Sequence, residues 1–138
     1  MTDDTRRQEI RLRDPKIVGE LLGRICDEVD EVEHVVLTSR DGLAIASDST
    51  ADVGGEKSFS LHGSALAAAV ASIGDHFVEL VNRGRLRGVL FDVDDGCVGV
   101  YPISATLLLV VFGESGVTPG RFGAAVKKSV GILLAPDQ

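Results

Sequence analysis

The sequence is poor in cysteine, in aromatic residues and in basic charge, and each shortage excludes a class of function. Its 138 residues include only two cysteines, Cys26 and Cys97, one in a predicted helix and one in a predicted strand. Two such thiols are more typical of small buried apolar residues than of a disulfide bridge. Aromatic residues make up 4% of the chain, and no cluster of aromatic or polar residues is evident that would line a ligand cavity. A small-molecule sensor is therefore the least favoured of the functions considered.

Basic charge is outnumbered by acidic charge. The chain holds 14 Lys and Arg against 21 Asp and Glu, which gives a formal net charge of -7 at pH 7. Affinity for nucleic acid depends on clustered Lys and Arg, so RNA and DNA are not expected partners. The N-terminal MTDDTRRQEI has charge but no apolar segment of the kind that a secretory signal needs, and we expect a cytoplasmic protein.

The sequence also lacks an intact motif for a metal, a nucleotide or a catalytic group. Its three histidines show no ligand spacing with either cysteine. Residues 53–58 resemble a phosphate-binding loop, but Glu56 stands where that motif needs glycine, and a carboxylate there would repel phosphate. Residues 92–103 lack the glutamate that ends a calcium loop, and Ser39 lacks the nucleophile-elbow sequence that a triad with Asp41 and His34 would need. We therefore expect no cofactor, no metal and no catalytic residue.

The pattern along the chain predicts one domain of helices and strands. Residues 1–13 alternate acids and arginines without apolar periodicity, which predicts a flexible tail before a single domain over residues 14–135. Asp14 and Pro15 form a typical helix start. The elements expected after this start are a helix to about residue 30, strands at 34–39 and 43–47, a long helix at about 58–82, strands at 86–93, 97–103 and 106–113, and a helix at 119–133.

Short connections between most of these strands require neighbours to run antiparallel. The expected fold is α+β, with a five-stranded antiparallel sheet sandwiched by helices in the order αββαβββα. Residues 106–112 are apolar at consecutive positions, as in a central strand that is covered on both faces. The long helix should then cover one face and the other two helices the opposite face, while residues 86–93 should form an edge.

The long predicted helix carries no charged residue between Ser58 and Gly74. Its serines, histidine and alanines argue against a membrane span, which needs roughly 20 predominantly apolar residues. Helical periodicity divides the segment into two stripes. We expect the stripe of large residues to face the protein's own core; it comprises Phe59, Leu66, Val70, Ile73, Phe77 and Val81. We expect the stripe of small residues to be a self-association surface that makes the protein a homodimer; with its flanks it comprises Leu61, Ser64, Ala65, Ala68, Ser72 and Asp75.

Three segments together resemble a known family. They are VLTSRDGLAIAS, ALAAAVASIGDHFVELV and GVLFDVDDGCVGVYPI, and over about residues 16–134 the chain is similar to the bacterial branch of the Roadblock dynein-light-chain family. The resemblance implies a homodimer in which central helices pack together and edge strands pair, which would add Arg87, Val89 and Phe91 to the interface. Because many similar bacterial members act with small Ras-like GTPases, it also implies such a partner.

Two charged clusters have either a structural or a docking interpretation. Asp27, Glu28, Asp30 and Glu31 gather at the end of the first predicted helix, where they form either a solvated face or a docking patch for a basic partner. Arg83 and Arg85, close to Arg87, stand where the long helix ends. They either cap that helix and keep an edge strand soluble, or contact a GTPase.

The function expected from these observations is that of a noncatalytic homodimeric regulator that binds and modulates a small Ras-like GTPase. The alternative is a scaffold or adaptor subunit of a sensor or motor complex, with no effect on GTP hydrolysis. Membrane insertion is not expected in either case.

Overall fold

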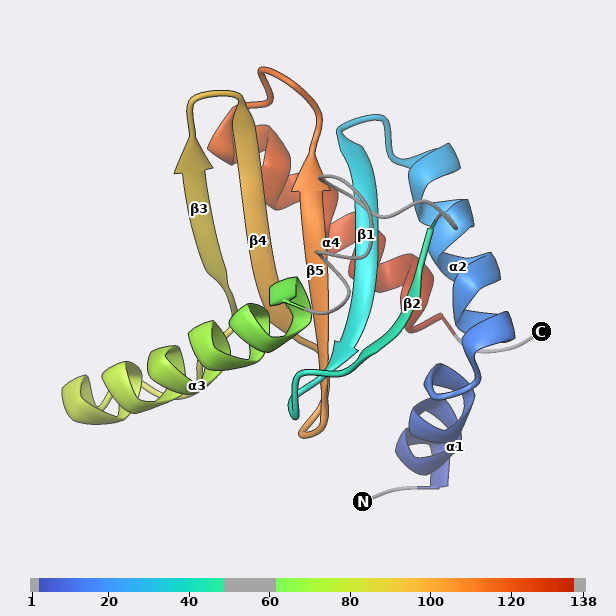
Figure 1. Ribbon diagram of the computed structural model, residues 1–138, viewed down its shortest axis with the longest axis horizontal. Coiled ribbons are helices and arrows are strands. Elements are labelled where there is room, and N and C mark those ends of the chain that lie inside the picture. Colours follow the sequence, from blue (N-terminus) through green and yellow to red (C-terminus); the bar gives the residue numbers. More distant parts are fainter. Residues whose placement is uncertain (1–2, 49–61, 136–138) are drawn as a thin grey trace.

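The computed structural model describes residues 3–48 and 62–135 and contains a five-stranded antiparallel sheet with helices on both faces (Figure 1). This arrangement confirms the α+β fold that the sequence predicts. The elements in chain order are α1 (Asp3–Leu12), α2 (Pro15–Glu28), β1 (Val32–Ser39), β2 (Ala44–Ser47), α3 (Ser64–Val81), β3 (Val89–Val93), β4 (Gly96–Pro102), β5 (Leu107–Gly113) and α4 (Pro119–Leu133).

The strands lie in the order β2-β1-β5-β4-β3. The central strand β5 pairs with β1 on one side and with β4 on the other, so that Val110 lies between Val36 and Val100. All five residues from Leu107 to Val111 are buried, as the unbroken apolar run predicts. β3 forms one edge of the sheet, also as predicted.

Alternate residues of the central strands serve two separate cores. One core contains Val35, Leu37 and Leu109 together with residues of α2 and α4. The other contains Val36 and Val110 and their neighbours on the same side, together with residues of α3. Because successive side chains of a strand point to opposite faces, α2 and α4 cover one face and α3 covers the other, which confirms the predicted layering.

The hairpin turns contain glycines in a conformation that other residues rarely adopt. Gly42 has φ +91° between β1 and β2, and Gly96 has φ +110° at the start of β4. A Cβ at Gly96 would lie 2.7 Å from the carbonyl oxygen of Glu114. Both turns thus contain glycine where a positive φ is required, since glycine adopts this conformation without steric cost.

The N-terminal segment differs from the flexible tail that the sequence predicts, because residues 3–12 form the helix α1. Leu12 is buried in the core. The Glu9 carboxylate accepts hydrogen bonds from the hydroxyls of Ser104 and Thr106, at 2.9 and 2.5 Å. Apolar periodicity does not reveal this helix, since one apolar residue and several side-chain hydrogen bonds attach it.

Candidate functional site

The helix α3 packs on the sheet through its small residues, which reverses the orientation that the sequence predicts. Ser64, Ala67 and Ala71 are buried, and the two alanines belong to the core beneath α3. Small side chains allow the helix to lie close to the branched residues of the strands. Placing Ser64 in a dimer interface is therefore wrong, because its side chain is sealed within one chain.

The remaining residues of the predicted small-residue interface differ in their exposure. Ala68 is half-buried and packs against the same core. Ala65 and Ser72 are exposed, while Leu61 and Phe59 lie outside the described residues. The predicted core stripe is wrong at Leu66, Ile73, Phe77 and Val81, which are exposed, whereas Val70 is half-buried against the core.

The outward side of α3 carries an exposed stripe of large apolar residues, Leu66, Ile73, Phe77 and Leu80, which we call the α3 apolar face. Each of these side chains is at least 65% exposed. Their spacings of seven, four and three residues place them on one side of the helix, as in a seam that packs against another helix. In Figure 1 the C-terminal part of α3 extends past the edge of the sheet. A stripe of this size in water is typical of an interaction site.

The edge strand β3 extends the apolar surface that begins on α3. Phe91 and Val93 are 42% and 47% exposed on the α3 face of the sheet, since Phe91 pairs with Val98, which packs against the core beneath α3. Leu90, which is 39% exposed, points to the opposite face. The helix lies close to the connection that leads into this strand, because a Cβ at Gly74 would be 2.7 Å from Leu86. Of the eleven large apolar side chains that are exposed in the described ranges, eight belong to α3 or β3. The predicted edge residues Val89 and Phe91 are half-buried and exposed, respectively.

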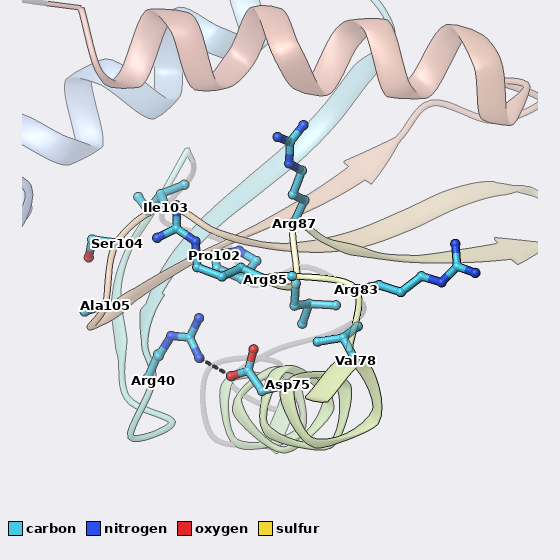
Figure 2. Close-up of a pocket in the computed structure, with 12 residues that line it drawn as sticks. Arg40, Asp75, Val78, Arg83, Arg85, Arg87, Pro102, Ile103, Ser104 and Ala105 are labelled. Atoms are coloured by element: carbon cyan, nitrogen blue, oxygen red, sulfur yellow. Dashed lines mark hydrogen bonds and ion pairs between the residues drawn. The ribbon is translucent and has the colours of Figure 1, made fainter. Parts of the chain in front are cut away.

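A cavity of about 1000 Å³ opens beside α3 at the end of the sheet where β3 begins (Figure 2). We call it the arginine cleft, because its lining includes Arg40, Arg83, Arg85 and Arg87. Arg40 comes from the turn between β1 and β2, and the other three come from the connection between α3 and β3. The rest of the lining comes from Asp75 and Val78 of α3, from Gly84 and Leu86, and from residues 102–105, which are the last residue of β4 and the start of its connection to β5.

The arginines of the cleft differ in their surroundings. Nη1 of Arg40 lies 2.7 Å from Oδ2 of Asp75, and both side chains are partly exposed. Nε of Arg40 is buried without a hydrogen-bond partner among the described residues. Figure 2 shows Arg85 extending along residues 102–104, whereas Arg83 and Arg87 point away from Arg40 and in different directions. Asp75, expected at the dimer interface, thus pairs with an arginine of its own chain.

The acidic cluster is at the end of α2, and Figure 1 shows this end of the helix at the opposite end of the sheet from the turn between β1 and β2 and from the start of β3. Glu28 pairs with Arg24 at 2.5 Å, and Glu31 pairs with Arg121 at 3.4 Å. Asp27 and Asp30 are exposed. Since neighbouring arginines neutralise part of this cluster, the structure offers less free charge here than the sequence suggests.

Ser39 and His34, which the sequence offers as candidate catalytic residues, do not form a catalytic arrangement. Oγ of Ser39 accepts a hydrogen bond from the backbone N–H of Leu43, while the ring of His34 faces Asp48 at 3.3 Å.

Burial is the main factor that raises the pKa of Cys26 to about 12, and it also raises the pKa of Cys97. Thiols of this kind are unreactive at neutral pH. Within residues 3–48 and 62–135, no group of three His, Cys, Asp or Glu could hold a metal ion.

Among the described residues, one helix, α3, is long and apolar enough to cross a membrane by length and composition. Its small residues contact the sheet, as in a helix of a globular domain. The segment therefore has one side that the fold covers and one side that the described chain leaves open.

Comparison with known proteins gives one family and several similar folds. The family model described as Roadblock/LC7 domain matches residues 17–112. MglB of Myxococcus xanthus superposes with a TM-score of 0.67 at 14% identity, over 85% of this chain and 91% of that one. A Roadblock/LC7 domain from Streptomyces avermitilis has a TM-score of 0.67 at 21% identity, over 81% and 90% of the two chains. The gliding protein MglB of Thermus thermophilus has a TM-score of 0.67 at 17% identity, over 83% and 84%. No protein with a curated description matches the sequence.

Proposed function

Because the chain belongs to the Roadblock/LC7 family, we propose that it is a homodimeric regulatory protein that binds a small Ras-like GTPase and modulates its nucleotide cycle. The proposal assigns no catalytic residue to this chain. The observation that carries it is the α3 apolar face, which the described chain leaves uncovered next to the edge strand β3.

The exposed positions on α3 support a dimer in which two copies of this helix pack together. Burying a Leu, Ile or Phe side chain contributes about 1.5–3 kcal/mol relative to leaving it in water, and the face holds four such residues on one copy. A second copy supplies the same surface, as the two-fold symmetry of a homodimer requires. Pairing of β3 with its copy would join two sheets and remove an exposed edge.

The GTPase partner comes from the family resemblance. A dimer of this form is a rigid platform that binds one arrangement of a partner's mobile loops better than another. Differential affinity of this kind shifts the population of the partner's conformations. The regulator would thus act through shape and charge.

Measuring GTP hydrolysis and nucleotide exchange of candidate Ras-like GTPases from the same genome, with and without the purified protein, tests this function. We expect binding together with a changed rate of one of the two steps for at least one GTPase. Binding with both rates unchanged would contradict the regulatory role and favour the scaffold function. Absence of binding to every candidate would also contradict the regulatory role.

A further inference from the structure

The arginine cleft is a local concentration of positive charge on an acidic protein. Four of the 14 basic residues of the chain line it, with Asp75 as the one acidic residue in the lining, so the lining carries +3 while the whole chain carries -7. A negatively charged molecule is repelled by most of such a surface and attracted to one basic region of it. The cleft is therefore a place where an acidic ligand would be oriented by charge.

The directions of the arginine side chains indicate what form that ligand has. A compact phosphate is held by several donors that converge on one point. In Figure 2 Arg83 and Arg87 point away from Arg40 and from one another, so the guanidinium groups do not converge on one point. The lining also contains apolar side chains, including Val78 and Leu86. This distribution fits an extended segment that presents carboxylates one after another.

In the free chain, Asp75 forms an ion pair with one of the arginines, Arg40. Its carboxylate lies 2.7 Å from Nη1 of Arg40, although 43% of the Asp75 side chain is exposed. A half-exposed ion pair of this kind is weak, because water and salt screen it. A carboxylate from outside can therefore replace Asp75 at Nη1 of Arg40, whose side chain is itself partly exposed.

We propose that the arginine cleft docks an acidic segment of a protein partner, and that Asp75 competes with this segment for Arg40. The inference rests on the proposed function for the partner itself, the regulated GTPase. The cleft lies beside α3 and the start of β3, the two elements that the proposed dimer would use. The docking site and the self-association surface would thus lie next to each other at the same end of the sheet.

Fluorescence anisotropy with a labelled peptide of alternating glutamate and glycine tests the charge chemistry without the GTPase. We expect the peptide to bind the wild-type chain, and R40Q/R85Q to weaken binding by about tenfold or more. R85Q alone should weaken it less and leaves the Arg40–Asp75 pair in place. The same peptide with glutamine in place of glutamate should not bind.

Two further variants serve as controls for this experiment. R24Q/R121Q removes the same number of charges at the far end of the sheet and should leave peptide affinity unchanged. D75N removes the competing carboxylate and should strengthen binding by about threefold. Circular dichroism confirms that each variant is folded, and R40K/R85K, which keeps the charge, should retain part of the affinity.

Several outcomes would overturn the inference. Equal affinities of R40Q/R85Q and R24Q/R121Q would show that general charge, and not the cleft, binds the peptide. Displacement of the peptide by tripolyphosphate at concentrations below those of the peptide itself would show a phosphate site. If R40Q/R85Q changes GTPase turnover as strongly as the wild-type chain does, this inference is wrong while the proposed function stands. If no GTPase responds to the wild-type chain, the proposed function fails, and the peptide results still decide the cleft.

Discussion

The two sides of α3 are opposite in residue size and in exposure. The side toward the sheet carries Ser64, Ala67 and Ala71, all buried, while the outward side carries residues such as Ile73 and Phe77, at least 65% exposed. Small residues are buried here because they let two backbones approach, and large apolar residues are exposed because the described chain has nothing to cover them. A large apolar residue on a helix therefore identifies a surface to be buried, and the partner that buries it can be another molecule.

The largest effect should come from placing the same charge on opposite sides of α3. Ala71→Arg puts an unpaired charge into the core beneath the helix and should destabilise the fold by at least about 3 kcal/mol. Ala69 is exposed on the outward side, so Ala69→Arg should leave the unfolding free energy of the monomer nearly unchanged. Chemical denaturation at a concentration that keeps both variants monomeric measures the free energy of unfolding of each variant. Equal destabilisation by the two substitutions would contradict the assignment of one side of α3 to the core and the other to the surface.

A smaller effect is expected at the edge strand that adjoins the outward side. Phe91 is 42% exposed on β3, and Phe91→Lys should weaken self-association by about tenfold or more by placing a charge in the interface. Sedimentation equilibrium gives the dissociation constant. As a control, Leu43→Lys alters a residue with 69% exposure on the other hairpin; a similar loss from both would show that the edge strand is not part of the interface.

A still smaller effect is expected on the buried side of α3, from removal of the Ser64 hydroxyl. Oγ of Ser64 is buried and has no hydrogen-bond partner within the described parts of the chain. Ser64→Ala should therefore stabilise the fold by about 1 kcal/mol, since the cost of leaving a polar group unsatisfied disappears. Thermal or chemical unfolding measures the change. A weakened dimer with unchanged unfolding energy would instead place Ser64 in the interface.

The smallest effect should come from a change in pH. It should weaken the attachment of α1, a helix that belongs to neither side of α3. Hydrogen bonds from the Thr106 and Ser104 hydroxyls, in that order of effect, lower the pKa of Glu9. A carboxyl whose pKa is lowered by folding stabilises the folded state above its unfolded pKa of about 4.3, and this contribution disappears as pH falls through the lowered value. Amide hydrogen exchange should thus show α1 loosening at acid pH before the sheet does.

Replacing Glu9 with glutamine should make the exchange of α1 independent of this titration. If α1 in the Glu9→Gln variant still loosens over the same pH range as in the wild-type chain, another group must control its attachment.

Much of the fold could be predicted because its signals are local. Asp14 does cap α2, accepting a hydrogen bond from the backbone N–H of Lys16 at 3.1 Å. Gly96, a residue type that is common in hairpin turns, has a positive φ where β3 turns into β4. The apolar run of β5 identifies it as the central strand. The α1 helix could not be found in this way, because contacts with residues nearly a hundred positions away attach it.

The candidate site was harder to predict for a geometric reason. Helical periodicity separates the two sides of α3 but does not say which one meets the sheet, and residue size favoured the wrong choice. The spacing of Leu66, Ile73, Phe77 and Leu80 was the signal that could have indicated a helix seam. For the arginine cleft, Arg83 and Arg85 were visible as a cluster, whereas Arg40 joins them only through an ion pair with a residue 35 positions away.

We expect the α3 apolar face to be buried by a second copy of the chain. Light scattering coupled to size-exclusion chromatography tests it with the wild-type chain, Ile73→Arg and the control Ile10→Arg, whose residue is 67% exposed on α1. We expect the mass of a dimer for the wild-type chain and for Ile10→Arg, and the mass of a folded monomer for Ile73→Arg. A wild-type chain that is monomeric at micromolar concentration, or an Ile73→Arg variant that remains a dimer, would contradict the claim.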